Sequence, residues 1–126
     1  MGRMKTYGVT VSGFPEAVYS ALTPAKARVQ AWYEYTSAFE CTFKEFLKIS
    51  TLRRCDVPEK DGYGYVRRSY GVDPKIGGRV RLINEGSSSG CEGEVAYPGS
   101  STAHVRVLLD GRDSSVWVHP NNIRSI

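Results

Sequence analysis

Cysteine, histidine and long apolar runs are all scarce in this chain of 126 residues. Its three cysteines, Cys41, Cys55 and Cys91, are odd in number and widely spaced, so neither a disulfide framework nor a zinc pattern fits them. We therefore expect free thiols in a reducing cytoplasm. No stretch approaches the roughly 20 apolar residues that a membrane-spanning helix needs. The first residues also lack an apolar run long enough for a signal peptide, so we expect no membrane partner.

Catalytic signatures are equally scarce. The chain has two histidines, His104 and His119, and no P-loop, nucleophile elbow, His-Glu metal helix or dinucleotide fingerprint. The nearest carboxylates, Glu92 and Glu94, lie among arginines on a predicted strand, which favours cross-strand ion pairs. A cysteine–histidine pair that meets only in space stays open. We predict that the protein is not an enzyme and has no catalytic residue, metal or cofactor.

The clearest pattern that is present covers residues 75–126. Short segments of alternating apolar and polar residues, separated by glycine turns, are followed by a Pro-Asn-Asn corner and a last short segment. Alternation of this kind predicts strands with one buried face. The segments therefore predict a small antiparallel barrel. About fifty residues bury little surface, so we expect the barrel to pack on the rest of the chain.

Residues 1–58 predict a separate lobe with a β-hairpin over 5–12 and 18–22. Thr23 followed by Pro24 predicts the start of a helix, and Thr42 with Glu45 predicts the capping box of a second, shorter helix. A third strand is expected over 51–55. The apolar residues expected to be buried on the two helices are Ala25, Val29, Trp32, Thr36 and Phe39 on the first, and Phe46, Leu47 and Ile49 on the second.

Residues 59–74 are polar, aromatic and rich in glycine, and they show no periodicity. They predict a linker, with room for a short strand over 65–70. Arg67 and Arg68 lie among tyrosines, a mixture that suits base stacking and phosphate binding, although an ordinary surface loop is the simpler interpretation. The predicted fold class is α+β, with an N-terminal hairpin and two helices packed on a C-terminal antiparallel barrel.

Arginines are the leading candidates for binding an anion in this chain of net charge +4. Arg28 lies one turn inside the first predicted helix, where a phosphate could also reach free N–H groups, or it could lie over Trp32. Arg53 and Arg54 would point to opposite faces of a strand, so at most one reaches a given ligand. Arg106 is a lone charge in an apolar strand, and we expect it to meet a defined partner.

Two resemblances add to these patterns. The block 76–126, through RVRLI, GCEGEV and HPNNIR, resembles the SH3-like barrels of the KOW type found in ribosomal and transcription-elongation proteins. In the first lobe, the succession YGVTVSGF, VYSALTPAKARVQAW and FKEFLKISTLRR resembles small phage and prophage proteins, the anti-Thoeris sponges. Those sponges sequester cyclic ADP-ribose signals made by bacterial TIR-domain defence enzymes, and some also hold cyclic oligonucleotides.

The sponge resemblance implies an α+β protomer that forms dimers or larger oligomers in the cytoplasm of a bacterial host cell. It implies ligand pockets near protomer boundaries, with arginines on the phosphates and an aromatic ring on the base. The residues that it implies for the ligand are Arg28, one of Arg53 and Arg54, and Arg106. The rings that could stack on the base are Tyr70 and Tyr97, with Tyr65 and Trp117 as alternatives.

The leading hypothesis is a non-enzymatic phage or prophage protein that sequesters a cyclic nucleotide immune signal and so counteracts anti-phage defence. The alternative is a KOW-like module that binds nucleic acid or a transcription or ribosome partner, with affinity that falls steeply with salt. From residue 59 onward the chain has nine basic and eight acidic residues, a near balance that argues against strong binding to a nucleic-acid polymer. A second alternative is a protein that inhibits a host defence protein directly.

Overall fold

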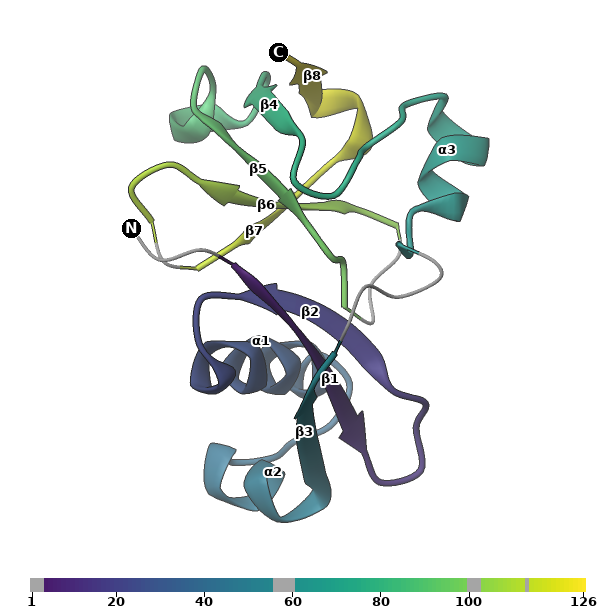
Figure 1. Cartoon of the computed structure of the whole chain (residues 1–126), viewed down its shortest axis with the longest axis vertical. Helices are drawn as coiled ribbons and strands as arrows, with labels where there is room; N and C mark the ends of the chain where they lie inside the picture. Colours follow the sequence, from purple (N-terminus) through teal and green to yellow (C-terminus); the bar gives the residue numbers. More distant parts are fainter. Residues whose placement is uncertain (1–3, 56–60, 100–102, 113) are drawn as a thin grey trace.

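The computed structural model describes residues 4–55, 61–99, 103–112 and 114–126, and it shows an α+β chain with two antiparallel sheets (Figure 1). The first sheet has the strand order β2-β1-β3, and the second has the order β7-β6-β5-β4-β8. Each sheet has its own cluster of buried apolar side chains. We call the part around the first sheet the first lobe, and the curled part around the second sheet the barrel lobe.

The first lobe follows the predicted order of two strands, two helices and a third strand. The strands β1 (Lys5–Val11) and β2 (Ala17–Ala21) form the expected hairpin. The helices α1 (Pro24–Thr36) and α2 (Phe43–Ile49) follow, and β3 (Ser50–Arg54) returns to pair with the other edge of β1. In Figure 1, α1 lies between the barrel lobe and α2, so its two flanks face different neighbours.

Both helices begin where their caps predict. The Thr23 side chain accepts a hydrogen bond from the backbone N–H of Lys26 at 3.2 Å. Thr42 accepts from the N–H of Glu45 at 3.2 Å, and the Glu45 carboxylate accepts from the N–H of Thr42 at 3.0 Å. These bonds satisfy N–H groups that have no partner inside a helix. The two predicted helix starts are confirmed.

The buried face of α1 differs from the predicted stripe. The helix buries Ala27, Gln30, Ala31 and Glu34, whereas the large side chain of Phe39 is 47% exposed beyond the helix end. Two alanines allow the helix to lie close to the sheet, and the two polar residues find partners in the barrel lobe. The prediction for α2 is also wrong in part, because Phe46 is buried while Leu47 and Ile49 are 42% and 37% exposed.

The barrel lobe confirms the predicted series of short strands. Its five-stranded sheet curls into an antiparallel half-barrel, with short 3-10 turns at Gly86–Ser88 and Pro120–Asn122. The first of these turns lies in the serine-rich tip, and the second forms the Pro-Asn-Asn corner. The strands are β4 (Arg79–Leu82), β5 (Glu92–Ala96), β6 (Val105–Leu109), β7 (Val116–Val118) and β8 (Ile123–Ser125).

A helix, α3 (Gly64–Tyr70), replaces the predicted short strand before the barrel. Tyr63 and Val66 are fully buried in the core of the barrel lobe. The Tyr63 hydroxyl donates to the Ala96 carbonyl at 2.5 Å and accepts from the N–H of Arg106 at 3.0 Å. The segment from 61 to 70 is therefore an integral part of the barrel lobe, since Tyr63 and Val66 complete that core.

The two lobes join where β5 runs on beside β2. The N–H of Tyr97 donates to the Ser20 hydroxyl at 3.0 Å, Tyr19 forms a bridge with Pro98, and the N–H of Gly99 donates to the Val18 carbonyl at 2.8 Å. Gly99 has a φ of +74°, and a Cβ there would overlap the Tyr19 ring and the carboxylate of Glu34. The close approach of the two lobes therefore requires glycine at this position.

Cys41, Cys55 and Cys91 are free thiols, as expected. None of the helices in the described part of the chain is long and apolar enough to cross a membrane. The same residues contain no group of three or more histidine, cysteine and acidic side chains that could hold a metal ion.

Candidate functional site

A hollow of about 520 Å³ lies between α1 and the edge of the barrel lobe. We call it the interlobe hollow. One flank of α1 and the strands β6 and β7 form its walls, so neither lobe could build it alone. Its lining residues are Lys26, Val29, Gln30, Tyr33, Glu34, Arg106, Ser114, Ser115, Val116 and Trp117.

Arg106 lies in the wall of the interlobe hollow and is the most constrained charge near it. It sits on the face of β6 opposite the barrel core, and the first lobe covers it so that its side chain is 5% exposed. Its guanidinium donates to the Glu34 carboxylate at 3.0 Å and to the Ser115 hydroxyl at 3.1 Å, with a longer bond of 3.4 Å to the Gln30 amide oxygen. The expected defined partner of Arg106 is therefore Glu34.

The ion pair between Arg106 and Glu34 is buried on both sides. Burial lowers the pKa of Arg106 below its ordinary value, and the nearby carboxylate of Glu34 opposes that shift. The Nε atom of Arg106 is buried and has no hydrogen-bond partner among the described residues. Glu34 also accepts from the Tyr19 hydroxyl at 3.1 Å. Because a buried charge is costly without its partner, this pair fixes how the lobes meet.

Two exposed aromatic rings flank the interlobe hollow. Trp117 is the cross-strand neighbour of Arg106, whose Cζ lies 4.9 Å from the centre of the indole ring. The His104 ring lies 6.5 Å from the same indole in a stacked arrangement. Trp117 is 44% exposed, and Tyr33 on the α1 wall is 64% exposed. Rings that remain accessible beside a buried cation can stack on a planar ligand.

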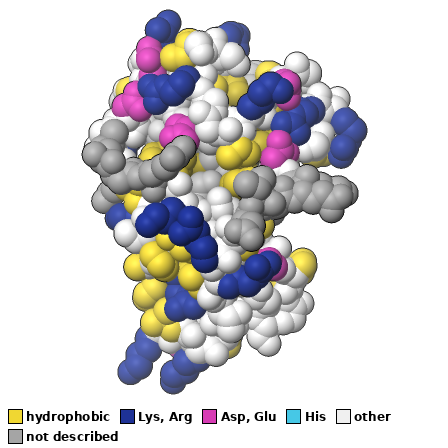
Figure 2. Space-filling view, in the orientation of Figure 1, with side chains coloured by type: hydrophobic (Ala, Val, Ile, Leu, Met, Phe, Trp, Pro, Cys, Tyr) yellow, Lys and Arg dark blue, Asp and Glu magenta, His cyan; other side chains and the backbone are white. Residues whose placement is uncertain are grey.

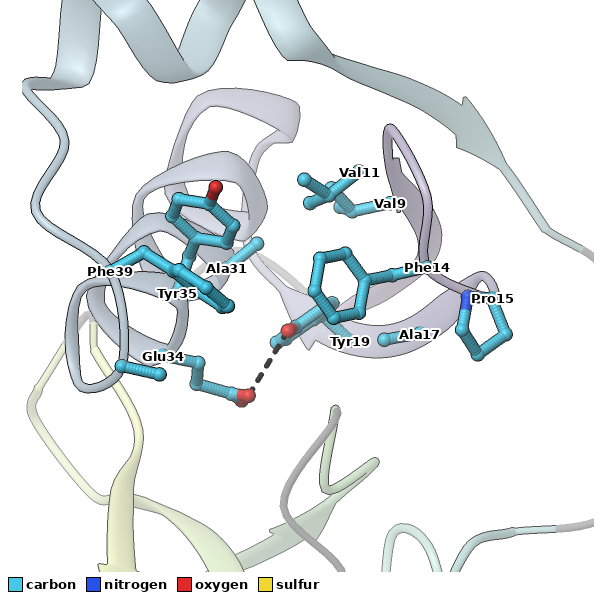
Figure 3. Close-up of a pocket in the computed structure, with 11 residues that line it drawn as sticks. Val9, Val11, Phe14, Pro15, Ala17, Tyr19, Ala31, Glu34, Tyr35 and Phe39 are labelled. Atoms are coloured by element: carbon cyan, nitrogen blue, oxygen red, sulfur yellow. Dashed lines mark hydrogen bonds between the residues drawn. The ribbon is translucent and has the colours of Figure 1, made fainter.

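A second, smaller pocket of about 220 Å³ lies within the first lobe (Figure 3). We call it the aromatic pocket. In Figure 3, Phe14 lies on one side of it and Tyr35 and Phe39 lie on the other, with Glu34 and Tyr19 joined by a hydrogen bond at one end. Glu34 therefore lines both pockets.

Arg28 lies on the flank of α1 that faces away from the interlobe hollow. Successive helical residues turn by about 100°, so Arg28 lies roughly 160° from Gln30. Trp32, one turn further on, donates from its indole to the Cys41 carbonyl beside α2 at 2.9 Å. The side chain of Arg28 is half-buried, and its Nε has no hydrogen-bond partner among the described residues. Arg28 lines neither of the two pockets.

Arg53 and Arg54 point to opposite faces of the first sheet, as predicted. Arg53 forms two hydrogen bonds with Glu16, at 2.6 and 2.7 Å, on the face away from α1. Arg54 pairs with Tyr7 across the strands, and its Cζ lies 5.9 Å from the centre of that ring on the face that α1 covers. Like Arg28, Arg53 and Arg54 line neither pocket, whereas Arg106 lines the interlobe hollow.

Neither of the two leading tyrosines lines the interlobe hollow. Tyr97 is 6% exposed, so its ring has almost no surface for a ligand. Tyr70 ends α3, where it contacts Tyr65 at 6.4 Å and His119 at 5.1 Å between ring centres. Of the predicted site residues, only Arg106 reaches the hollow. Trp117, an alternative at the level of sequence, is the ring that accompanies it.

Gln30, Tyr33 and Glu34 were missed by the sequence analysis. A signal was present, because Gln30 and Glu34 are four residues apart and so share one helix face. Two polar side chains on that face indicate a contact with another polar element, which here is Arg106.

No family model matches the chain, and neither the curated proteins nor the solved structures contain a match.

Proposed function

We propose that the protein is a non-enzymatic binding protein that sequesters a cyclic nucleotide signal of the cyclic ADP-ribose type. The observation that carries the proposal is the exposed indole of Trp117 beside the buried cation of Arg106 in a hollow of about 520 Å³. The base stacks on Trp117 and Tyr33, while Gln30 and the hydroxyl of Ser115 supply hydrogen bonds to its edge.

Arg106 faces the hollow as the positive end of its ion pair with Glu34, and in this proposal other cations supply the rest of the charge that holds the phosphates. Lys26 lines the same wall of the hollow. Arg28 and Arg54 do not line the hollow within one chain. In a homo-oligomer of the kind that the sponge resemblance implies, a neighbouring copy supplies them. The proposal therefore includes self-association, and the protein acts in a bacterial cell against anti-phage defence.

Sequestration without turnover agrees with the chemistry of the lining. Among the described residues, neither pocket is lined by a histidine or a cysteine, and the serines of the interlobe hollow have no such base beside them. The carboxylate at these walls, Glu34, is held by Arg106 and by the Tyr19 hydroxyl, which agrees with a binding role.

A small ligand also fits the charges of the barrel lobe better than a nucleic-acid polymer does. In this proposal the half-barrel is SH3-like, but two arginines on its outer face are engaged by acids. Arg79 pairs with Asp110 at 2.5 Å, and Arg81 pairs with Glu92 at 2.7 Å. On the face shown in Figure 2, basic side chains of this lobe lie beside acidic ones. Binding to a polymer needs arginines and lysines that are available to phosphates.

The test is calorimetric titration of the whole chain with cyclic ADP-ribose, combined with native mass spectrometry for self-association. We expect Trp117→Leu to weaken binding by about 1–3 kcal/mol, or roughly fivefold to 150-fold, because a stacked base loses its ring. Tyr65→Leu is the matched control, since Tyr65 is 47% exposed against 44% for Trp117 but lies outside the hollow.

Equal affinity for the ligand in Trp117→Leu and the unmodified chain would contradict the site. Steeply salt-dependent binding of RNA or DNA, with no retention of cyclic ADP-ribose, would contradict the function and favour a nucleic-acid module.

A further inference from the structure

We propose that the aromatic pocket binds the alkylammonium group of a small free molecule, such as a trimethylammonium head. This ligand differs in charge from the one proposed for the interlobe hollow. The pocket lies on the opposite side of Glu34, and the two proposals stand independently. The lining residues that carry the argument are Phe14, Tyr35, Phe39, Tyr19 and Glu34.

Three rings form the walls of the pocket. Tyr35 and Phe39 stack on each other, with ring centres 4.9 Å apart and planes inclined by 26°. Phe14, from the turn between β1 and β2, meets them at 89° and 64°, with centres 6.3 and 5.9 Å away. The walls therefore come from two separate segments and meet at a steep angle (Figure 3). Aromatic faces arranged around a cavity attract cations, and quaternary ammonium groups in particular, through the ring quadrupole.

The charge at the end of the pocket has the matching sign. Among the described residues that line the pocket, Glu34 is the one that carries a charge, and the others are apolar or aromatic. Its carboxylate pairs with Arg106, which lines the interlobe hollow and not the aromatic pocket. The buried pair thus turns its negative end toward the aromatic pocket. A methylated cation needs little hydrogen bonding, which suits walls made of rings and of Val9, Val11 and Ala31.

The size of the pocket is also adequate. Its volume of about 220 Å³ exceeds that of the engineered apolar cavity of about 150 Å³ that takes up benzene. Phe14 and Phe39 are 49% and 47% exposed, so the pocket reaches the protein surface at these two rings. Exposed rings at a pocket mouth also allow the test to remove a ring without disturbing the core.

The experiment is a titration of the full chain, followed by two-dimensional NMR, with choline and with its uncharged isostere 3,3-dimethyl-1-butanol. We expect choline to bind about tenfold more tightly than the neutral compound, because the two differ in charge and hardly in shape. Phe14→Leu should weaken choline binding about tenfold, with shifted signals confined to the first lobe. Tyr65→Leu is the control, since Tyr65 is 47% exposed in the barrel lobe.

Equal binding of choline and the neutral compound would overturn the proposal, because the pocket would then be merely apolar. So would the absence of choline binding, or an unchanged affinity in both Phe14→Leu and Phe39→Leu. Two ring variants are included because Phe14 also helps to close the turn before β2. A folded spectrum of each variant is required before its affinity is compared.

Discussion

The ion pair between Arg106 and Glu34 holds the two lobes together through two side chains. Each is 5% exposed, and each comes from a different lobe. A lone arginine between valines indicates that a partner exists, but it does not say which acid the partner is. The spacing of four from Gln30 to Glu34 would have narrowed the choice of acid, had the buried face of α1 been placed correctly.

Replacing Arg106 by methionine should destabilise the fold by about 3–5 kcal/mol, because Glu34 would remain buried without its cation. The double variant Arg106→Met with Glu34→Leu should recover much of that loss. The free energy of unfolding, measured by urea denaturation, tests this. Arg53→Met is the control, since the Arg53 side chain in its pair with Glu16 is 66% exposed and such a pair is worth about 0–1 kcal/mol. An equal loss in the single and double variants would contradict the argument.

At the scale of elements, the capping residues predicted the helix starts correctly. The spacing of apolar residues predicted the wrong buried face for α1. Thr23-Pro24 and the Thr42–Glu45 box act locally, so they can be recognised without the rest of the chain. The stripe through Trp32 and Phe39 followed large residues. The structure instead places small and polar residues against the sheet and the barrel lobe, a choice that depends on tertiary contacts.

The helix α3 was missed for a similar reason. Residues 61–70 have no clear apolar period, because Tyr63 and Val66 are the members that enter the core. Arg67 then holds the helix to its flanking loops. It hydrogen-bonds to Asp61 at 2.6 Å and to Asp73 at 2.6 Å, and it also donates to the carbonyl of Pro74. These contacts span six and seven residues of irregular chain, and no pattern in the sequence predicts them.

The hydrogen bonds of Arg67 with Asp61 and Asp73 should make the stability of the fold depend on pH. Hydrogen bonds from Arg67 lower the pKa of Asp61 and of Asp73, so the folded state favours both carboxylates in their charged form. This contribution is present above the unfolded pKa of about 3.9 and is lost as the pH falls through the lower folded values. Arg67→Met should therefore be less stable than the unmodified chain at pH 6, with a difference that shrinks toward pH 2.

Thermal unfolding at a series of pH values measures this effect. Arg68→Met on the same helix is the control, since Arg68 is exposed and has no part in the Asp61 and Asp73 bonds. A stability difference that stays constant from pH 6 to pH 2 would show that Arg67 acts through packing alone.

At the scale of the whole molecule, the contact between lobes depends on a few close approaches. The backbone of Gly99 lies against Tyr19 and Glu34, and its φ of +74° is unfavourable for other residues. The alternation of apolar and polar residues predicted the barrel, but it did not predict the contact of the barrel lobe with β2. That contact includes a hydrogen bond of 3.0 Å between Ser20 and Tyr97, which are 77 residues apart in the sequence.

Gly99→Ala should separate the two reasons for glycine at this junction, which are the positive φ and the close contact with Tyr19 and Glu34. Gly111 serves as the matched control, because its φ is +79° but a Cβ there would meet nothing within 4 Å. Gly111→Ala should cost about 1–2 kcal/mol from backbone strain alone. Gly99→Ala should cost more, and it should also shift the NMR signals of Tyr19 and of the barrel edge. Equal losses of unfolding free energy in the two variants would contradict the close contact.

Because the Glu34 carboxylate lines both cavities, we expect a ligand in one to influence the binding of a ligand in the other. If an anion in one cavity draws the guanidinium of Arg106 toward itself, the carboxylate of Glu34 gains negative potential for a cation in the other. By thermodynamic linkage the enhancement is mutual, and each molecule raises the affinity of the other by the same factor. The ion pair would then couple the two binding sites, because its carboxylate lines both of them.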